Sequence, residues 1–513
     1  MLYNFFMAYG ETNMKESLVQ AVGADQSTMA YTSEVSDIVQ DAVGYPPNAP
    51  WDKPIGEWLG VLKERLGPIC KANVEIFKHF ENKDNKSDET LIFEIFADLT
   101  PEITEIAISQ FEQGYHGPKS WREVNGDASD RLEEKITNAL STDKFSGMLG
   151  RSKGIRKALE FVKNVLIHSN DPDYIFRKHS EYIETCVEAN ANGESILFIP
   201  FDSDYTNPVE NFGDMTQICE ASISVILPIE TEERAKFNKL ANSLWSRLKQ
   251  RGNKTDVSIP KFIVGKDMGA AGFSVLSSTV GEVVTFDSGK GNEHCIYLAL
   301  NNLAKKIEYW NISSEVVNTH TSKSPEAFFK TATLLYLLHE EGHRLFPENG
   351  LYGETTTDIP AVITAVKMAF ENGGYDLHVV ITGVLTEYVS EIVTGVSEEA
   401  WFEGHRENKS NKIFDGYILS AVLILNSLTD SGLVRMNREG GIDINATPDN
   451  LKLFFADLEM VDAKFYEKDK KILERISLAV ANPEALELID LFRTKFKEKL
   501  FSQKAFIPTE VTQ

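Results

Sequence analysis

Two histidines and a glutamate stand at a spacing that suits metal-assisted hydrolysis. His339 and His343 are four residues apart, and Glu340 directly follows the first of them. On a helix, residues four apart project from one face, so both imidazoles can bind one tetrahedral Zn²⁺. The Glu340 carboxylate would lie beside that ion, where it can take a proton from a metal-bound water. The HExxH pattern therefore predicts Zn²⁺ as cofactor, two histidine ligands and a general base.

The alternative interpretation makes His339 and His343 ordinary hydrogen-bonded core residues, with Glu340 turned outward. Two imidazoles and a carboxylate buried together under an apolar helix are costly unless a metal or other partners satisfy them. This cost favours the metal site over the structural interpretation.

The helix that would carry the motif has a clear beginning. Ser324 suits the N-cap, Pro325 suits the first helical position, and Glu326 places a negative charge in the first turn. The apolar run from Leu334 to Leu338 leads directly into the motif, so we expect a mostly buried helix.

A third ligand must come from elsewhere in the chain. Glu354 could turn back to the metal, with Asp358 holding a ligand histidine from behind. Pro360 favours a helix that starts near Thr357, which leaves Glu354 in the preceding turn and makes Asp358 the rival ligand. The alternative for Glu354 is a solvated loop acid.

Other acids and histidines are weaker candidates. Glu387 and Glu391 lie on a later predicted helix and are further possible ligands. His294, His320 and His378 are isolated, and isolated histidines are more often core or surface residues than ligands.

The motif and its surroundings resemble the gluzincin metallopeptidases, in which a glutamate of an E-x-x-x-D pattern on a second helix is the third zinc ligand. Downstream, a segment containing Gly404 and His405 precedes an apolar helix over 417–428 and a glycine turn at 440–441. This order is similar to the dipeptidyl peptidase III-like group, which has one more residue between its two histidines.

The resemblance implies specific roles. His339, His343 and Glu354 would be the zinc ligands, Glu340 the general base, and His405 the group that stabilises the oxyanion of the transition state. From the residues alone, Arg406 could supply the same positive charge, and His405 has an alternative as an exposed loop residue.

Periodicity along the chain predicts a mostly α fold of two helical lobes with a smaller mixed α/β segment between them. We interpret this as a two-lobed, zincin-like metallohydrolase with its cleft between the lobes. We expect a helical N-terminal lobe over 1–190, a mixed α/β segment over 191–310 and a helical catalytic lobe over 311–513. Gly269 to Gly272 is predicted as a hairpin connection, since it lacks the Lys and Ser/Thr of a phosphate loop.

Charge and composition argue against several other classes of protein. The 513 residues carry 52 Lys and Arg against 77 Asp and Glu, a formal net charge of −25, which disfavours nucleic acid and anionic lipid as partners. The 4 cysteines form no CxxC pair, as is usual for reduced, cytoplasmic proteins. No apolar run reaches the ~20 residues of a membrane span.

These observations together predict a cytoplasmic, zinc-dependent metallopeptidase that hydrolyses peptide bonds of a peptide substrate. The alternative from another class is a noncatalytic structural or binding protein, such as an assembly component, in which the metal site is structural or a relic. The sequence leaves the oligomeric state open.

Overall fold

The structure is a computed structural model. It describes residues 87–113, 119–199, 221–229, 231–242 except 233, 236 and 240, 260–272, 281–287, 292–299, 317–318, 325–345, 353–372, 375–395, 416–467 and 480–504. These residues fall into two compact units, the first containing those up to Ala299 and the second those from Val317 onward. The described part is mostly helical with small sheets, which confirms the predicted mostly α fold class.

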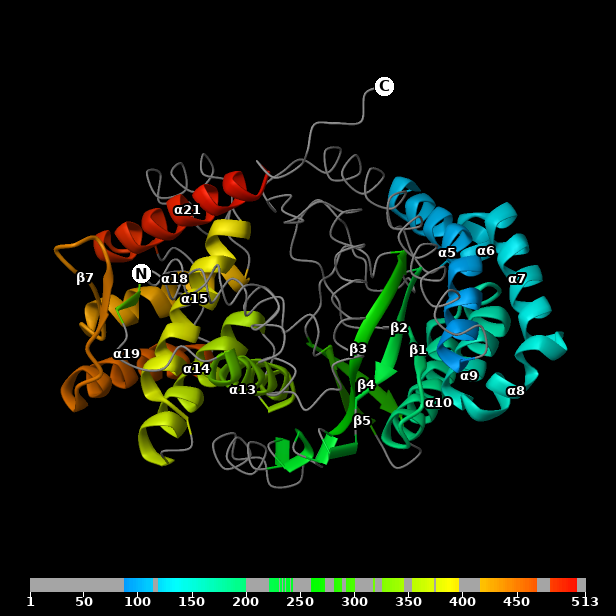
Figure 1. Cartoon of the computed structure of the whole chain (residues 1–513), viewed down its shortest axis with the longest axis horizontal. Helices are drawn as coiled ribbons and strands as arrows, with labels where there is room; N and C mark the ends of the chain where they lie inside the picture. The colour runs from blue at the N-terminus through cyan, green and yellow to red at the C-terminus, as the bar shows by residue number, and fades with distance from the viewer. Residues whose placement is uncertain are drawn as a thin grey trace. The chain divides into compact units, whose positions relative to one another are not determined.

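The first unit consists of helices followed by a five-stranded sheet, and the helices lie beside the sheet in Figure 1. Its elements are α5 (Asp88–Gln113), α6 (Trp121–Val124), α7 (Gly126–Ser141), α8 (Asp143–Arg151), α9 (Lys153–Phe161), the π-helical η1 (Val162–Leu166), α10 (Pro172–Ala191), β1 (Ile196–Phe198), β2 (Ser222–Pro228), β3 (Lys261–Gly272), β4 (Gly281–Asp287) and β5 (Asn292–Ala299).

Side-chain caps explain where several of these helices begin. Ser120 and Glu123 form a reciprocal capping box at the start of α6, and the Asn125 side chain accepts a hydrogen bond from the Ala128 N–H at the start of α7. Asp171 caps α10 in the same way, with Pro172 at the first helical position.

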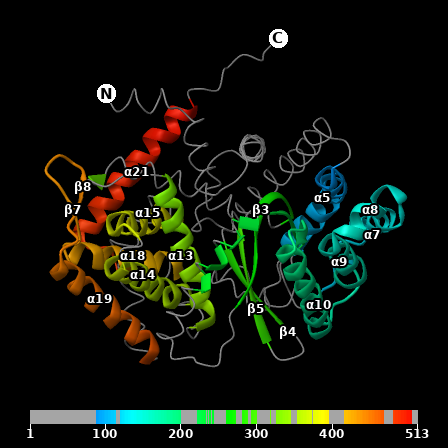
Figure 2. The ribbon, with the colours of Figure 1, turned by 60° about the horizontal axis from the view of Figure 1, so that its bottom comes forward.

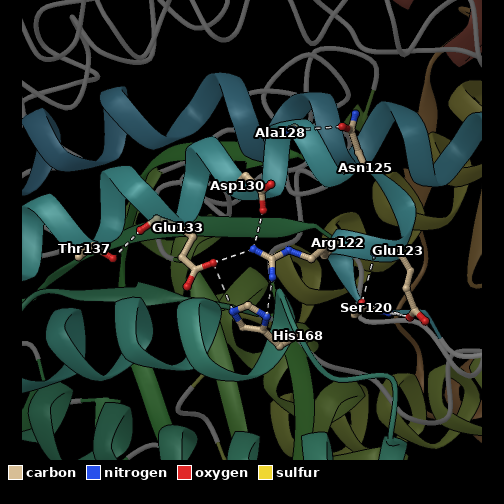
Figure 3. Close-up of polar contacts among 9 residues, drawn as sticks. All are labelled: Ser120, Arg122, Glu123, Asn125, Ala128, Asp130, Glu133, Thr137 and His168. Atoms are coloured by element: carbon tan, nitrogen blue, oxygen red, sulfur yellow. Dashed lines mark hydrogen bonds and ion pairs between the residues drawn. The ribbon is translucent and has the colours of Figure 1, made fainter.

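An exposed polar cluster joins the end of η1 to α6 and α7 (Figure 3). The Arg122 guanidinium lies 2.5 Å from an Asp130 carboxylate oxygen and 2.9 Å from a Glu133 oxygen. The His168 ring contacts both Arg122 and Glu133, with Nδ1 3.2 Å from Arg122 Nη1 and Nε2 3.4 Å from Glu133 Oε2. Because Arg122 lies at the centre of this cluster, we interpret the cluster as a set of surface contacts that holds these helices together.

The five strands are ordered β1-β2-β3-β5-β4. All neighbouring pairs are antiparallel except β3 and β5, which are parallel, so β5 lies between the two strands that precede it in the chain. The helix α5 packs against β2 and β3, and α10 packs against β1, β3 and β4. One continuous apolar core therefore links the helices and the sheet.

The glycine-rich segment Gly269–Gly272 corrects a prediction from the sequence. It is not a hairpin connection but the end of β3, paired with β2 in the register Ser222↔Gly272 and Val225↔Gly269. Gly272 has a φ of +65°, and a Cβ there would lie 1.6 Å from the Ala221 carbonyl oxygen. Glycine is needed at this position for the close approach of two strands, which the sequence pattern alone cannot distinguish from a turn.

The second unit is built from long helices and a three-stranded sheet of order β6-β8-β7, shown from a second direction in Figure 2. The helix α14 contacts α13, α15, α18 and α19. The elements are β6 (Val317–Asn318), α13 (Pro325–Leu345), α14 (Gly353–Asn372), α15 (Leu377–Gly395), α18 (Gly416–Asp430), β7 (Val434–Met436), β8 (Ile442–Ile444), α19 (Pro448–Glu467) and α21 (Pro483–Lys504).

The helix α13 begins at Pro325, as the sequence predicts, but α14 begins earlier than expected. It starts at Gly353 rather than near Thr357, so Glu354 lies in its first turn and Pro360 lies within the helix. Proline removes one backbone hydrogen bond. The residues on either side of Pro360 are almost completely buried, and this tertiary packing outweighs the local preference.

None of the described helices is long and apolar enough to cross a membrane.

Candidate metal centre

Two packed helices bring the predicted ligands together. His339 and His343 are one turn apart on α13, and Glu354 and Asp358 are one turn apart on α14. The spacing of four residues places the two side chains of each pair on one face of their helix, and α13 packs directly against α14. Glu354 faces the histidines because α14 extends back to Gly353, which is the departure from the predicted helix start described above.

Three side-chain atoms converge between these helices. His343 Nε2 lies 3.1 Å from His339 Nε2, and Glu354 Oε2 lies 3.3 Å from His339 Nε2 and 3.6 Å from His343 Nε2. Ligands bound to a tetrahedral Zn²⁺ at 2.0–2.1 Å are separated from one another by about 3.3 Å. Within the described part of the chain, His339, His343 and Glu354 are the group of side chains that could hold a metal ion, and their separations match that ion.

Asp358 lies on the opposite side of the His339 ring. Its Oδ1 is 2.8 Å from His339 Nδ1, whereas the converging atom of that ring is Nε2. Thr357 Oγ1 lies 3.5 Å from Nδ1 of the second histidine, His343. Each imidazole therefore has its Nδ1 beside an oxygen and its Nε2 at the centre, the arrangement in which neighbouring groups orient ligand histidines.

Burial and charge change the proton affinity of the groups at this centre. Burial lowers the pKa of His339, but the carboxylates of Asp358 and Glu354 raise it by more, and it stands well above its ordinary value. Burial raises the pKa of Glu340, while the charges of His339 and His343 act in the opposite direction. Glu340 is 5% exposed, so the predicted general base lies within the protein interior close to both histidines.

The other candidates lie elsewhere. Glu387 is on α15 and accepts a hydrogen bond of 2.5 Å from the Tyr336 hydroxyl. His378 is half-buried at the start of α15, and His294 lies on β5 in the first unit. His405, Arg406 and His320 lie outside the described residues.

Two residues at this centre were not singled out from the sequence. The Tyr388 hydroxyl on α15 donates to Asp358 Oδ1 at 3.0 Å, and the Ser420 hydroxyl on α18 donates to Asp358 Oδ2 at 2.5 Å. The available signal was weak: Ser420 is a polar residue within the apolar run of its helix, and such a buried hydroxyl requires a partner.

Comparison with known proteins gives a likeness in fold. No family model and no curated sequence matches the chain. The solved structure of DPP III from Caldithrix abyssi matches with a TM-score of 0.51 and 13% identity, covering 94% of this chain and 93% of that chain. The dipeptidyl-peptidase III of Corallococcus sp. strain EGB matches with a TM-score of 0.47 and 14% identity, covering 75% and 71% of the two chains. The match to the Caldithrix abyssi structure supports the resemblance to the dipeptidyl peptidase III-like group at the level of the fold.

Proposed function

We propose that the chain is a zinc-dependent metallopeptidase that hydrolyses peptide bonds. The observation that carries this proposal is the convergence of three donor atoms, from His339, His343 and Glu354, at separations of 3.1 to 3.6 Å. Two imidazoles and one carboxylate form the donor set of many catalytic zinc sites, which keep a further position for water or substrate.

The donors fit Zn²⁺ in chemistry as well as in distance. His339 and His343 would bind through Nε2, and Glu354 through one carboxylate oxygen. Asp358 would hold His339 in the tautomer that leaves its Nε2 lone pair available. A bound Zn²⁺ lowers the pKa of a coordinated water to ≈ 7 and polarises a peptide carbonyl.

The protein's own groups would move the protons. Glu340 takes the proton of the attacking water and then passes it to the nitrogen of the leaving amine. Burial raises the pKa of Glu340, which favours the uptake of a proton by its carboxylate. In this proposal, His405 keeps its predicted role as the positive group beside the oxyanion.

The whole-length likeness to DPP III from Caldithrix abyssi supports peptides as the substrate class. That protein is a dipeptidyl-peptidase by name, and its fold extends over almost all of this chain. We therefore propose short peptides as the first substrates to test, with dipeptides as the first products to look for.

Substitution of Glu340 tests the proposal most directly. We expect Glu340→Gln to keep about one Zn²⁺ per chain and to lower the hydrolysis of a peptide library by at least 100-fold, because general-base catalysis contributes about 10²–10⁴-fold. Mass spectrometry of the cleaved peptides and metal analysis of the same protein samples give the two measurements.

A double variant and a matched control complete the test. His339→Ala combined with His343→Ala should lose both metal and hydrolysis, whereas Asp457→Asn, a change to an aspartate that hydrogen-bonds within the same unit, should lose neither. Zinc without hydrolysis in the unaltered protein would favour the noncatalytic alternative. Absence of zinc would contradict the proposal.

A further inference from the structure

Asp358 is the meeting point of four helices. It lies on α14 and contacts His339 of α13, Tyr388 of α15 and Ser420 of α18. Asp358 is 5% exposed, Tyr388 6% and Ser420 0%, so these contacts are protected from water. Hydrogen bonds in such an environment are strong, and they hold their partners in one arrangement.

The chemistry of the three contacts sets the direction of each hydrogen bond. An ionised carboxylate only accepts, whereas tyrosine and serine hydroxyls can donate. Oδ2 accepts from Ser420, and Oδ1 accepts from both Tyr388 and the His339 ring. The proton of the His339 ring is thereby placed on Nδ1, and the lone pair is on Nε2, the atom that faces His343 and Glu354.

We infer that Tyr388 and Ser420 are positioning residues of the metal centre. Both hydroxyls donate to the Asp358 carboxylate, and they act through Asp358 by fixing the orientation of that carboxylate. That orientation aims the Nε2 lone pair of His339 at the metal. This inference rests on the proposed zinc site and extends it to α15 and α18.

Loss of either hydroxyl should weaken zinc binding without removing a ligand. Substitutions of groups that orient metal ligands cost about 10- to 100-fold in metal affinity. Tyr388 and Ser420 contact Asp358 rather than a metal ligand, so their effect should be smaller. We expect the dissociation constant for Zn²⁺ to rise roughly 5- to 20-fold in Tyr388→Phe and in Ser420→Ala.

The helix α18 supplies a closely matched control for Ser420. Ser427, two turns later on the same helix, is 1% exposed and also donates its hydroxyl to an aspartate, Asp457 of α19. Ser427→Ala removes the same atom from the same helix, with no contact to Asp358. For Tyr388 the control is Tyr182→Phe in the first unit, where a buried hydroxyl donates to the Leu197 carbonyl.

The experiment measures the dissociation constant for Zn²⁺ by competition with a chromogenic chelator, using the full chain stripped of metal. Tyr388→Phe and Ser420→Ala should bind Zn²⁺ less tightly than the unaltered chain, and both control variants should bind it equally well. In an Asp358→Ala background, which has no acceptor for the Tyr388 hydroxyl, adding Tyr388→Phe should cause less than a 2-fold further loss, because its effect passes through the carboxylate.

The possible outcomes separate the inference from the proposed function. If the unaltered chain binds zinc and the four single variants match it, the inference is wrong and the metallopeptidase proposal stands. Equal losses in the test and control variants, or a full additional loss in the Asp358→Ala background, also overturn it, since both indicate general destabilisation. Failure of the unaltered chain to bind zinc contradicts the proposed function and the inference together.

Discussion

Two histidines, one in each unit, have opposite surroundings. His179 lies in the core of the first unit at 0% exposure, packed against the rings of Phe161 and Tyr182, and its Nε2–H donates to the Ile199 carbonyl at 3.1 Å. His339 lies in the second unit between the carboxylates of Asp358 and Glu354. Burial affects both rings, but only the second has negative charges beside it.

The consequence is a difference in proton affinity. Burial lowers the pKa of His179 to about 4, whereas the pKa of His339 is raised well above its ordinary value. A buried histidine therefore serves as a neutral core residue when its partner is a carbonyl, and as a cation or metal ligand when its partners are carboxylates. The neighbouring carboxylates of His339 account for the opposite directions of the two pKa shifts.

Alanine substitution of each histidine should give the largest contrast. Substitution of a residue that orients a metal ligand typically weakens metal binding by roughly 10- to 100-fold. His339→Ala should weaken zinc binding by more than this, because it removes a ligand atom. His179→Ala should leave zinc binding unchanged and lower the free energy of unfolding by about 2–4 kcal/mol through loss of core packing. Metal titration and urea unfolding measure the two effects, and a zinc defect in His179→Ala would remove the distinction between the units.

Acid should destabilise the first unit by a comparable amount. The unfolded chain protonates His179 below its ordinary pKa of 6.5, and the folded protein does so only below about 4. The unfolded state thus binds more protons in this window, and the unit should lose about 3 kcal/mol as the pH falls from 6.5 to 4. Hydrogen exchange of the α10 amides measures this loss, and His179→Gln should reduce it.

The stability of the metal-free second unit should change with pH in the opposite direction, because of His339. A raised pKa means that the folded state keeps a proton that the unfolded chain releases above 6.5. The stabilisation from this group is present below pH 6.5 and is lost as the pH rises through the folded-state pKa. Exchange of the α13 amides in stripped protein provides this measurement, and a slope of the same sign as in α10 would contradict it.

A third histidine, His168, lies in the region where substitutions should lower the free energy of unfolding least. It is exposed in the cluster of Figure 3, where Arg122 and Asp130 are 44% and 63% exposed. Exposed ion pairs contribute about 0–1 kcal/mol, and Arg122→Ala should lower the free energy of unfolding by less than about 1 kcal/mol. Ser120→Ala, which removes a helix cap nearby, should cost about 1 kcal/mol. A larger loss in Arg122→Ala would show that surface charges also matter in this protein.

The sequence predicted local features well. The helix start at Pro325 and the mostly α fold class follow from capping and helical periodicity. The errors came from tertiary packing. The start of α14 was misplaced because a buried proline was taken as a helix start, and Gly269–Gly272 was taken as a turn because close strand pairing also requires glycine.

For the candidate site, the motif indicated which helix carries it, but the third ligand stayed open between Glu354 and Asp358. Both acids lie on one face of α14, and only distances to the two nitrogens of His339 separate them. Tyr388 and Ser420 could not be found from spacing, because they are 30 and 62 residues from Asp358. The role of each is set by which helices pack together.

The placement of β5 between β3 and β4 has a consequence for how the first unit folds. The strands β4 and β5 are close in sequence and pair antiparallel, so this ribbon can form from local contacts. The parallel pairing of β3 with β5 joins residues further apart in the chain, so it carries a larger entropy cost of loop closure. We expect docking of the ribbon onto β3 to be the slow step of sheet assembly, with the edge of β3 exposed to other chains until it is complete.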